Sequence, residues 1–349
     1  MEWTRGHVLG RGSSATVFAA TSTSGDVFAV KSAHFAHSEN LKKEQKFLSI
    51  LKSPYVVSYK GCDITREGNN IIYNIFMDYM SGGSIMDSIS VRNGGALSNL
   101  EIANYTRQIV KGLEYIHSCG VVHCDIKGTN ILVEEKGVKI GDLGCAKWAN
   151  QASQIHGTPM FMAPEVAQGQ EQGFPADIWA LGCTMIEMAT GDLPWSNVDD
   201  PVSLLYKIAF CNEIPNIPNE LCDQGKDFLS KCFVRDPRQR WTAKQLLNHP
   251  YIHQQFDDNN SNQTIYKKPI NTSTSSPTSV LDQDVWNYID QEEVPNSSST
   301  LLCIERSSSS SLKIKQRIKQ LASSKKSIMS KLECEKEESE KWVTIRMNE

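Results

Sequence analysis

Several features that mark other classes of protein are missing from this 349-residue sequence. No stretch comes close to the roughly 20 consecutive apolar residues that a membrane-spanning helix requires, and the first residues contain no apolar signal core. Charge of one sign is not in excess, since 36 Lys and Arg face 40 Asp and Glu, which argues against nucleic acid as the main partner. We therefore expect a protein that binds neither membranes nor nucleic acids and resides in the cytoplasm, with residence in the nucleus left open.

The ten cysteines contain no repeated Cys-x-x-Cys pair. A disulfide framework and a zinc site are therefore disfavoured, and reduced thiols are expected. One group, formed by His117, Cys119, His123 and Cys124, is an alternative as a metal site. The spacing of these four residues matches no familiar zinc pattern. His123 also belongs to the segment from Val122 to Val133 that is described below.

The composition divides the chain into three parts. Residues 1–253 carry apolar runs with turn residues at intervals, which predicts a packed domain. Residues 254–311 are polar and rich in serine, and they predict a disordered linker because they bury too little apolar surface to offset chain entropy. Residues 312–349 begin with a basic amphipathic helical pattern and end in an acidic patch. This tail is either a solvated segment without a partner or a functional one. In the second case it binds an upstream kinase or another regulator, acts as a nuclear-import patch, or folds back on residues 1–253 and restrains their activity.

Within residues 1–253, the hydrophobic pattern predicts a small β-rich part followed by a large helical part. Residues 1 to about 80 hold short β-branched or alternating runs, which we expect to form an antiparallel sheet. Residues from about 81 to 253 hold long runs of helical periodicity. The expected strands are 7–9, 15–20, 27–31 and 71–77, and the expected helices are 38–51, 100–119, 177–189 and 223–232. This is an α+β fold with two lobes, and the crevice between them is the natural place for a nucleotide.

A glycine-rich segment from Gly10 to Ala15 lies between the first two expected strands. Glycines let backbone N–H groups approach a phosphate, although Ala15 stands in the place of a third glycine, and an isolated match of this kind is usually a plain turn. Lys31 follows on a later strand, and a lysine beside phosphates needs an anion to hold it. Glu44 in the next helix is the expected partner and Glu39 is a less well placed one. The alternative is that Lys31 and Glu44 are both solvated surface residues.

Two short segments carry the groups that phosphoryl transfer needs. The reaction requires a carboxylate near the attacking hydroxyl, oxygen ligands for Mg2+ and a cation near the transferred group. The segment from Val122 to Val133 supplies Asp125, Lys127 and Asn130, and Asp142 follows Asp125 by 17 residues. These residues predict a site for phosphoryl transfer from a nucleotide.

With these segments and those that follow them, the chain resembles the eukaryotic protein kinases. The matching segments occur in the family's order from Gly10 to about His249. They include Gly157-Thr158-Pro159, Asp177-Ile178-Trp179 and Arg240. The resemblance implies the bilobal protein kinase fold, with ATP and Mg2+ as cofactors and a protein hydroxyl as the acceptor. It also implies an ion pair between Glu165 and Arg240 and a helix residue, Asp177, that braces the catalytic loop.

The resemblance assigns the chemistry to a few residues. Asp125 would be the catalytic base or the residue that orients the substrate hydroxyl. Lys127 would face the γ-phosphate, which favours Ser/Thr over Tyr specificity. Thr158 resembles the threonine whose hydroxyl supports these two residues. Lys31, paired with Glu44, would contact the α- and β-phosphates.

The resemblance also assigns the cofactor contacts. Asn130 and Asp142 would hold Mg2+. Met77 would be the gatekeeper residue beside the adenine pocket, and the hinge from Asp78 to Met80 would present backbone groups to adenine. The remaining ATP contacts are expected at Leu9, Gly10, Gly12, Val17, Ala29 and Leu132.

Three segments of the chain indicate a subgroup within the protein kinases. The segments 157–165, 177–184 and 188–195 resemble mitogen-activated protein (MAP) kinase kinase kinases of the MEKK-like branch, and Cys124 and the serine-rich tail resemble the plant members. The expected substrates are MAP kinase kinases, which such an enzyme phosphorylates and activates.

Two other classes of protein are alternatives to an active protein kinase. A pseudokinase that acts as a scaffold would lack a catalytic group, and none of Lys31, Asp125, Asn130 and Asp142 is lacking. A P-loop enzyme or small-molecule kinase is disfavoured because no Gly-Lys-Ser/Thr follows the glycines.

The sequence departs from the family's pattern at Cys124 and Leu143 near the site, and another cysteine, Cys145, lies beside Leu143. Cys124 stands where many kinases have an arginine that pairs with a phosphate on the activation loop, and a neutral thiol cannot do so. We therefore expect activity to depend little on a phosphate docked there, with Ser153 and Thr158 as candidate phosphorylation sites. Leu143 replaces a phenylalanine and should keep its core contact. Cys145 is either a small packing residue or a redox-sensitive thiol.

Overall fold

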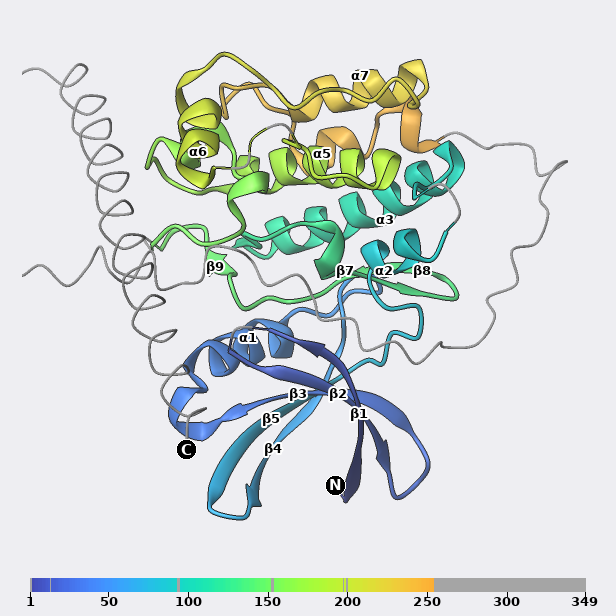
Figure 1. Ribbon diagram of the computed structural model, residues 1–349, viewed down its shortest axis with the longest axis vertical. Helices are drawn as coiled ribbons and strands as arrows, with labels where there is room; N and C mark the ends of the chain where they lie inside the picture. The colour runs from blue at the N-terminus through green and yellow to red at the C-terminus, as the bar shows by residue number, and fades with distance from the viewer. Residues whose placement is uncertain are drawn as a thin grey trace, which may run out of the picture.

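The computed structural model describes residues 2–12, 14–92, 95–151, 154–196, 198 and 200–253. The predicted linker at 254–311, the predicted tail at 312–349 and Ser153 lie outside the described residues. The described residues form a small lobe built on one sheet and a larger helical lobe, joined by a short hinge after Met77 (Figure 1). The predicted bilobal α+β fold is therefore confirmed.

The small lobe is an antiparallel sheet of five strands in the order β1-β2-β3-β5-β4. The strands are β1 (Trp3–Arg11), β2 (Thr16–Ser22), β3 (Val27–His34), β4 (Tyr59–Glu67) and β5 (Asn70–Met77). In the first pair Gly10 lies opposite Val17, and the N–H of Gly12 donates to the carbonyl of Ala15 at 2.9 Å. The glycine-rich segment is therefore the tip of a β-hairpin.

The two faces of this sheet are covered differently. Helix α1 (Glu39–Ile50), which follows the 3-10 helix η1 (Phe35–His37), lies over one face (Figure 1). It buries a stripe of apolar side chains formed by Leu41, Phe47 and Leu48. On the other face Trp3 packs on Phe28 and Phe76, and the three rings meet edge to face with centroid distances of 5.3 to 6.4 Å.

The larger lobe is built around two long helices, α3 and α5 (Figure 1). Its helices are α2 (Ile85–Ser90), α3 (Asn99–Ser118), α4 (Pro164–Ala167), α5 (Phe174–Thr190), α6 (Pro201–Phe210), α7 (Asp223–Cys232) and α8 (Ala243–Leu246), with 3-10 helices η2 (Gly128–Asn130), η3 (Pro159–Phe161) and η4 (Pro250–His253). Ser98 and Glu101 form a reciprocal capping box that fixes the start of α3. Helix α5 is apolar on nearly all sides and is buried from Ala176 to Ala189, so it forms the centre of the lobe.

Two short strand pairs lie where the lobes meet. Strand β6 (Val121–Val122) pairs with β9 (Lys147–Trp148), and β7 (Ile131–Glu134) pairs with β8 (Gly137–Ile140). Strand β8 is also bound to the segment before β4, because the N–H of Val57 donates to the carbonyl of Ile140 at 2.9 Å. These pairs place the loop after β6 and the loop after β8 at the boundary of the lobes.

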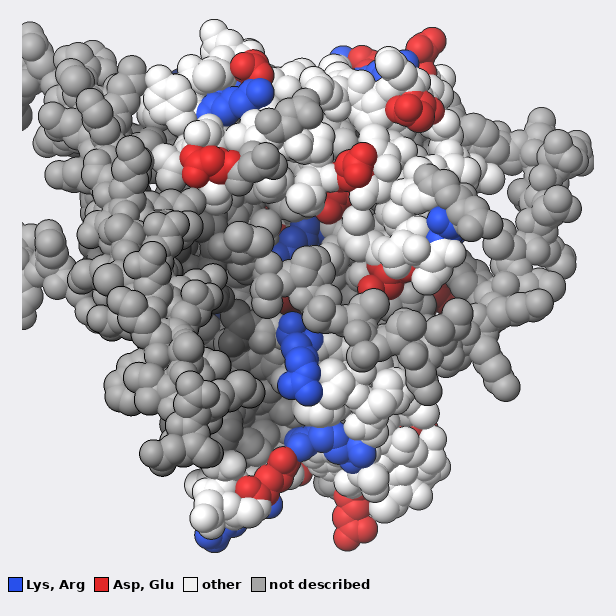
Figure 2. Space-filling model, in the orientation of Figure 1, with Lys and Arg blue, Asp and Glu red and all other residues white. Residues whose placement is uncertain are grey.

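The distribution of charged side chains on the surface of the described part agrees with the nearly equal numbers of basic and acidic residues in the sequence. Basic and acidic side chains are interspersed over both lobes on the face shown in Figure 2. No helix among the described residues combines the length and the apolar character that crossing a membrane requires.

The four predicted helices agree with α1, α3, α5 and α7 to within three residues at each end. The strands are predicted less well: β1 is longer than the expected 7–9, and β4 and helix α6 are not predicted at all. Strand β4 is an edge strand whose residues are all half-buried or exposed, so its hydrophobic pattern is weak. Helix α6 is only ten residues long.

Candidate active site

The loop between β6 and η2 is held by one buried carboxylate of α5. Asp177 is 1% exposed and accepts hydrogen bonds from the backbone N–H groups of His123, at 2.8 Å, and Cys124, at 2.9 Å. Cys124 has a φ of 68°, a left-handed conformation that residues other than glycine rarely adopt. The predicted bracing role of Asp177 is therefore confirmed: it fixes the strained backbone just before Asp125.

The two histidines of the alternative metal site have other partners. Nε2 of His117 lies 2.9 Å from Asp177. His123 accepts from the N–H of Asp125 through Nδ1, so its Nε2 carries the proton and donates to the carbonyl of Gly141 at 2.9 Å. Burial and the charge of Asp177 raise the pKa of Cys124 well above the ordinary value. Within the described ranges, no group of three or more His, Cys, Asp or Glu is placed to hold a metal ion. The metal alternative is therefore wrong.

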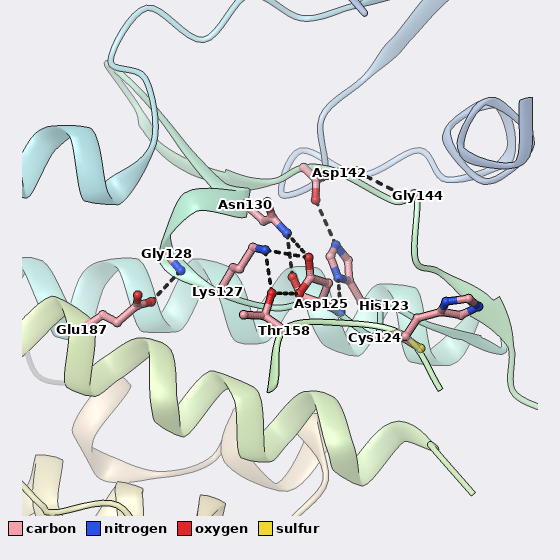
Figure 3. Close-up of polar contacts among 12 residues, drawn as sticks. His123, Cys124, Asp125, Lys127, Gly128, Asn130, Asp142, Gly144, Thr158 and Glu187 are labelled. Carbon is pink, nitrogen blue, oxygen red and sulfur yellow. Dashed lines mark hydrogen bonds and ion pairs between the residues drawn. The ribbon is translucent and has the colours of Figure 1, made fainter. Parts of the chain in front are cut away.

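Asp125 is the centre of the polar contacts drawn in Figure 3. Its Oδ1 accepts a hydrogen bond from the hydroxyl of Thr158 at 2.8 Å. Its Oδ2 accepts one from Nδ2 of Asn130 at 3.0 Å and lies 3.0 Å from Nζ of Lys127. Only 9% of the residue is exposed. The carboxylate is therefore fixed in one orientation by three donors from two loops.

Thr158 links Asp125 to Lys127 from the second of these loops. Its hydroxyl accepts from Nζ of Lys127 at 2.7 Å while it donates to Asp125. The preceding Gly157 has a φ of 112°, and a Cβ there would collide with the carbonyl oxygen of Cys124. A glycine is needed for this close approach of the two loops. Burial lowers the pKa of Lys127, but the charge of Asp125, its hydrogen bond with the lysine and the charge of Asp142 together outweigh burial and raise the pKa, so the ammonium group stays charged.

Replacement of Thr158 by valine should lower kcat by about 10- to 100-fold, because the two groups that it connects lose their fixed spacing. Affinity for ATP should change little, since the nucleotide contacts expected in the small lobe are untouched. The matched control is Thr158→Ser, which keeps the hydroxyl. Steady-state kinetics of both variants would contradict the idea if serine and valine lowered kcat equally.

Lys31 joins the two lobes through a pair of carboxylates. Its Nζ lies 2.7 Å from Oε2 of Glu44 in α1 and 2.9 Å from Oδ1 of Asp142 in the loop after β8. The predicted pair of Lys31 and Glu44 is confirmed, whereas Glu39 is exposed and pairs with Lys42. Burial disfavours the charge of Lys31, but the two carboxylates outweigh it and raise the pKa of the lysine.

The two carboxylates that share this ammonium group differ in protonation. The charge of Lys31 lowers the pKa of Asp142 to about 2. Burial instead raises the pKa of Glu44 to about 7. A single positive charge therefore keeps the more exposed Asp142 ionised and stabilises the buried Glu44 only in part.

The oxygen atoms predicted to bind Mg2+ suit that ion. The amide nitrogen of Asn130 donates to the backbone carbonyl of Asp125 at 2.8 Å and to its side chain. This fixes the amide with its oxygen as the group left to bind a cation. The side chain of Asp142 is 46% exposed, and only its Oδ1 is used by Lys31 and by the N–H of Gly144. Two oxygen ligands of this kind fit Mg2+, which otherwise keeps waters and phosphate oxygens.

The residues predicted to surround ATP lie around the boundary of the lobes. Ala29 pairs with Met77 across β3 and β5, and both are buried in one hydrophobic cluster against which Val17 and Leu132 pack. Leu9, at 39% exposed, lies on β1. Gly10 and Gly12 shape the hairpin tip, and Asp78 and Met80 form the hinge. The structure therefore brings the predicted nucleotide contacts to one region.

A contact behind the catalytic loop is not predictable from the sequence. Oε2 of Glu187, in α5, accepts a hydrogen bond from the N–H of Gly128 at 2.8 Å (Figure 3). Burial raises the pKa of this carboxyl from its usual 4.5 to about 7. No local signal marks Glu187, because its partner lies 59 residues away.

The raised pKa of Glu187 predicts a pH-dependent stability. The folded state binds a proton more tightly than the unfolded state, so stability falls as pH rises from about 4.5 to 7 and the loss is complete above that range. Glu187→Gln keeps the acceptor oxygen and removes the charge. Its free energy of unfolding relative to wild type should increase by up to about 3 kcal/mol between acidic and neutral pH. Urea unfolding at pH 5 and pH 8 measures this, and parallel pH profiles would contradict it.

Packing accounts for Leu143 and Cys145, two residues close to Asp142. Leu143 is 0% exposed and belongs to the main hydrophobic cluster, as expected. Burial and the nearby carboxylates of Asp125 and Asp142 raise the pKa of Cys145 to about 12. A thiol with so little thiolate favours the packing interpretation of Cys145 over a redox role.

Comparisons with known proteins agree with this geometry. Residues 3–252 match the model of the protein kinase domain. Over 320 residues the chain is 48% identical to mitogen-activated protein kinase kinase kinase 18 of Arabidopsis thaliana, which covers 87% of this chain and 91% of that protein. It is also 48% identical over 303 residues to mitogen-activated protein kinase kinase kinase 17 of the same plant, with 84% and 79% covered.

A more distant relative is mitogen-activated protein kinase kinase kinase A of Dictyostelium discoideum, at 37% identity over 297 residues, which are 80% of this chain and 30% of that protein. The similarity to the two plant proteins, in contrast, extends over most of both chains. The catalytic arrangement of Asp125, Lys127 and Thr158 is intact, and the chain belongs to the protein kinase family, as a Ser/Thr kinase of the mitogen-activated protein kinase kinase kinase group.

Proposed function

We propose that this kinase transfers the γ-phosphate of Mg-ATP to serine or threonine residues of MAP kinase kinases and thereby activates them. The observation that carries the proposal is the contact of Asp125 with both Thr158 and Lys127 at 2.8 to 3.0 Å. The names of the two plant relatives support the substrate class. No described residue favours the pseudokinase alternative, because each catalytic group is present and has its partner.

Each of these side chains has a separate role in the proposed reaction. Asp125 orients the substrate hydroxyl and accepts its proton, because its carboxylate is held by three donors and remains an acceptor. Lys127, positioned by Thr158, balances the negative charge of the transferred group. Lys31 holds the α- and β-phosphates. Bound Mg2+, on Asn130 and Asp142, would neutralise charge on the phosphate oxygens.

The experiment that tests this function uses the purified full chain, Mg-ATP and a panel of kinase-dead MAP kinase kinases. Wild type should phosphorylate some members of the panel, and Lys31→Met should not. If wild type binds nucleotide and phosphorylates none of them, the scaffold alternative replaces the proposed function.

We also propose that activity does not require a phosphate paired with residue 124. The thiol of Cys124 is buried and lies 3.7 Å from the carbonyl oxygen of Val122, so it presents no cation to a phosphate. Phosphatase treatment of the active kinase should leave phosphate transfer unchanged. A large loss of activity after the treatment would contradict the prediction.

The C-terminal tail and the cellular compartment are further parts of the proposal. We propose that the kinase works in the cytoplasm and that residues 312–349 bind a regulator or direct part of the protein to the nucleus. Imaging a fluorescent fusion with and without residues 312–349 tests this, and identical distributions would exclude the nuclear role of the tail.

A further inference from the structure

Asp78, the first residue of the hinge, joins three segments through its side chain. Its Oδ2 accepts hydrogen bonds from Nζ of Lys139 in β8, at 3.0 Å, and from the N–H of Ser58, at 3.2 Å. Its Oδ1 lies 3.2 Å from Nζ of Lys60 in β4. The N–H of Asp78 donates to the carbonyl of Ser58 at 3.1 Å. One carboxylate therefore connects the hinge with a strand of the small lobe and a strand of the larger lobe.

Lys139 belongs to the hairpin that carries part of the predicted adenine pocket. It lies directly opposite Leu132 in the β7–β8 pair, and side chains directly opposite in an antiparallel pair project from the same face. The segment just after the hinge is bound to the same hairpin, because the N–H of Gly82 donates to the carbonyl of Val133 at 3.0 Å and that of Val133 donates to the carbonyl of Gly83 at 2.8 Å. The chain is therefore attached to this hairpin at the first residue of the hinge and again directly after the hinge.

The ion pair at the start of the hinge is shielded from solvent. The side chains of Lys139 and Asp78 are 14% and 19% exposed, against 45% for Lys60. Partial burial raises the pKa of Asp78, but the hydrogen bonds from Lys139 and Ser58 and the charge of Lys139 outweigh it and lower the pKa to about 2. Screening by salt is weaker for such a pair than for exposed charges. Lys139 is therefore the main partner of Asp78, and Lys60 is the weaker one.

We propose that Lys139 is a positioning residue for the nucleotide. Through Asp78 it holds the hinge at a fixed distance from the β7–β8 hairpin, so the backbone groups of the hinge and the side chain of Leu132 keep the spacing that adenine requires. The inference rests on the proposed nucleotide site and deepens it. On this proposal, the affinity for ATP and the rate of nucleotide release depend on Lys139, which acts through the hinge. Without the ion pair, the hinge must be ordered at the moment of binding, and affinity falls.

The test compares wild type with Lys139→Met in the full chain, using steady-state kinetics and stopped-flow release of a fluorescent ADP analogue. We expect KM for ATP and the rate of ADP release to rise about five- to tenfold, with kcat at saturating ATP nearly retained. Asp78→Asn should give the same result. The effect of the double variant should be clearly smaller than the sum of the two single effects, because both substitutions remove the pair of Lys139 and Asp78. Each also removes one weaker contact, that of Lys139 with Glu134 at 3.6 Å and that of Asp78 with Lys60 at 3.2 Å. Lys139→Arg, which keeps the charge, should restore most of the affinity.

The matched control is Lys207→Met. It removes another ion pair of similar length, 2.9 Å to Glu213 in the larger lobe, and should leave both nucleotide parameters unchanged. Thermal unfolding shows that each variant is folded. Wild-type values in Lys139→Met, a loss that falls on kcat instead of KM, or additive effects in the double variant would each overturn the inference. A wild-type protein that binds no nucleotide would instead overturn the proposed function.

Discussion

Asp125→Asn should lower phosphate transfer to a MAP kinase kinase by about 100- to 10,000-fold without unfolding the protein. The carboxylate is the acceptor for three donors, the Thr158 hydroxyl, the Asn130 amide and the Lys127 ammonium group. An asparagine has one oxygen in place of two, so its amide N–H2 must face one of these donors. The variant thus loses the charge that accepts the proton and also disturbs the groups around it. The kcat of the purified variant measures the effect.

Two further measurements make this result specific. Nucleotide affinity of Asp125→Asn should stay close to that of wild type. The melting temperature should fall only moderately, because the change keeps the size of the side chain but turns an amide N–H2 toward one buried donor. Glu135→Gln is the control for loss of one negative charge, since Glu135 is exposed in the turn between β7 and β8. Asp125→Asn with more than about a tenth of the wild-type kcat would show that Asp125 is not the base.

Arg240→Met should destabilise the kinase by about 3–5 kcal/mol, because it leaves the carboxylate of Glu165 buried without a partner. The arginine binds both oxygens of Glu165, at 2.7 and 2.9 Å, and donates to the carbonyls of Val234 and Pro175. The two side chains are 0% and 5% exposed. This confirms the predicted ion pair. In a domain of this size, such a loss corresponds to a fall in the melting temperature of about 10 °C or more.

Arg238 supplies the matched control for this prediction. It lies two residues earlier and pairs with Asp236 at 3.1 Å, but its side chain is 87% exposed. Arg238→Met should therefore leave the melting temperature close to that of wild type, because water and salt screen an exposed pair. The double variant Arg240→Met/Glu165→Leu should be more stable than Arg240→Met, because no unpaired charge is left in the interior. Equal melting temperatures for the Arg240 and Arg238 variants would refute the argument.

The parts of the site that the sequence predicts are those fixed by local structure. Asp125, Lys127 and Asn130 lie within six residues, where a turn and the short helix η2 determine their relative positions. Lys31 and Glu44 are 13 residues apart, on β3 and on α1, with only the short η1 between these elements, so few carboxylates were candidates for the partner. The long helices were predictable for a similar reason, since a buried stripe repeats at helical spacing within one segment.

The contacts that the sequence does not predict join distant segments. Asp78 and Lys139 are 61 residues apart, and their pairing depends on the β7–β8 hairpin lying beside the hinge. Nothing near Lys139 distinguishes it from the other lysines. The same holds for Glu187, which is charged but buried in a helix that is otherwise apolar. Such contacts are decided by the packing of the lobes, which a local pattern does not contain.

The cluster around Lys31 also has a consequence for which form of nucleotide can enter. Two ammonium groups, those of Lys31 and Lys127, face the three carboxylates of Glu44, Asp142 and Asp125. Even when Glu44 is protonated, the charges of the cleft only balance, so the cleft offers no positive surplus to a polyanion. A nucleotide without a divalent cation therefore gains no net attraction from these five groups, whereas the cation of one that carries Mg2+ is attracted to the carboxylates of Asp125 and Asp142. The charges around Lys31 thus favour entry of the nucleotide together with its cation.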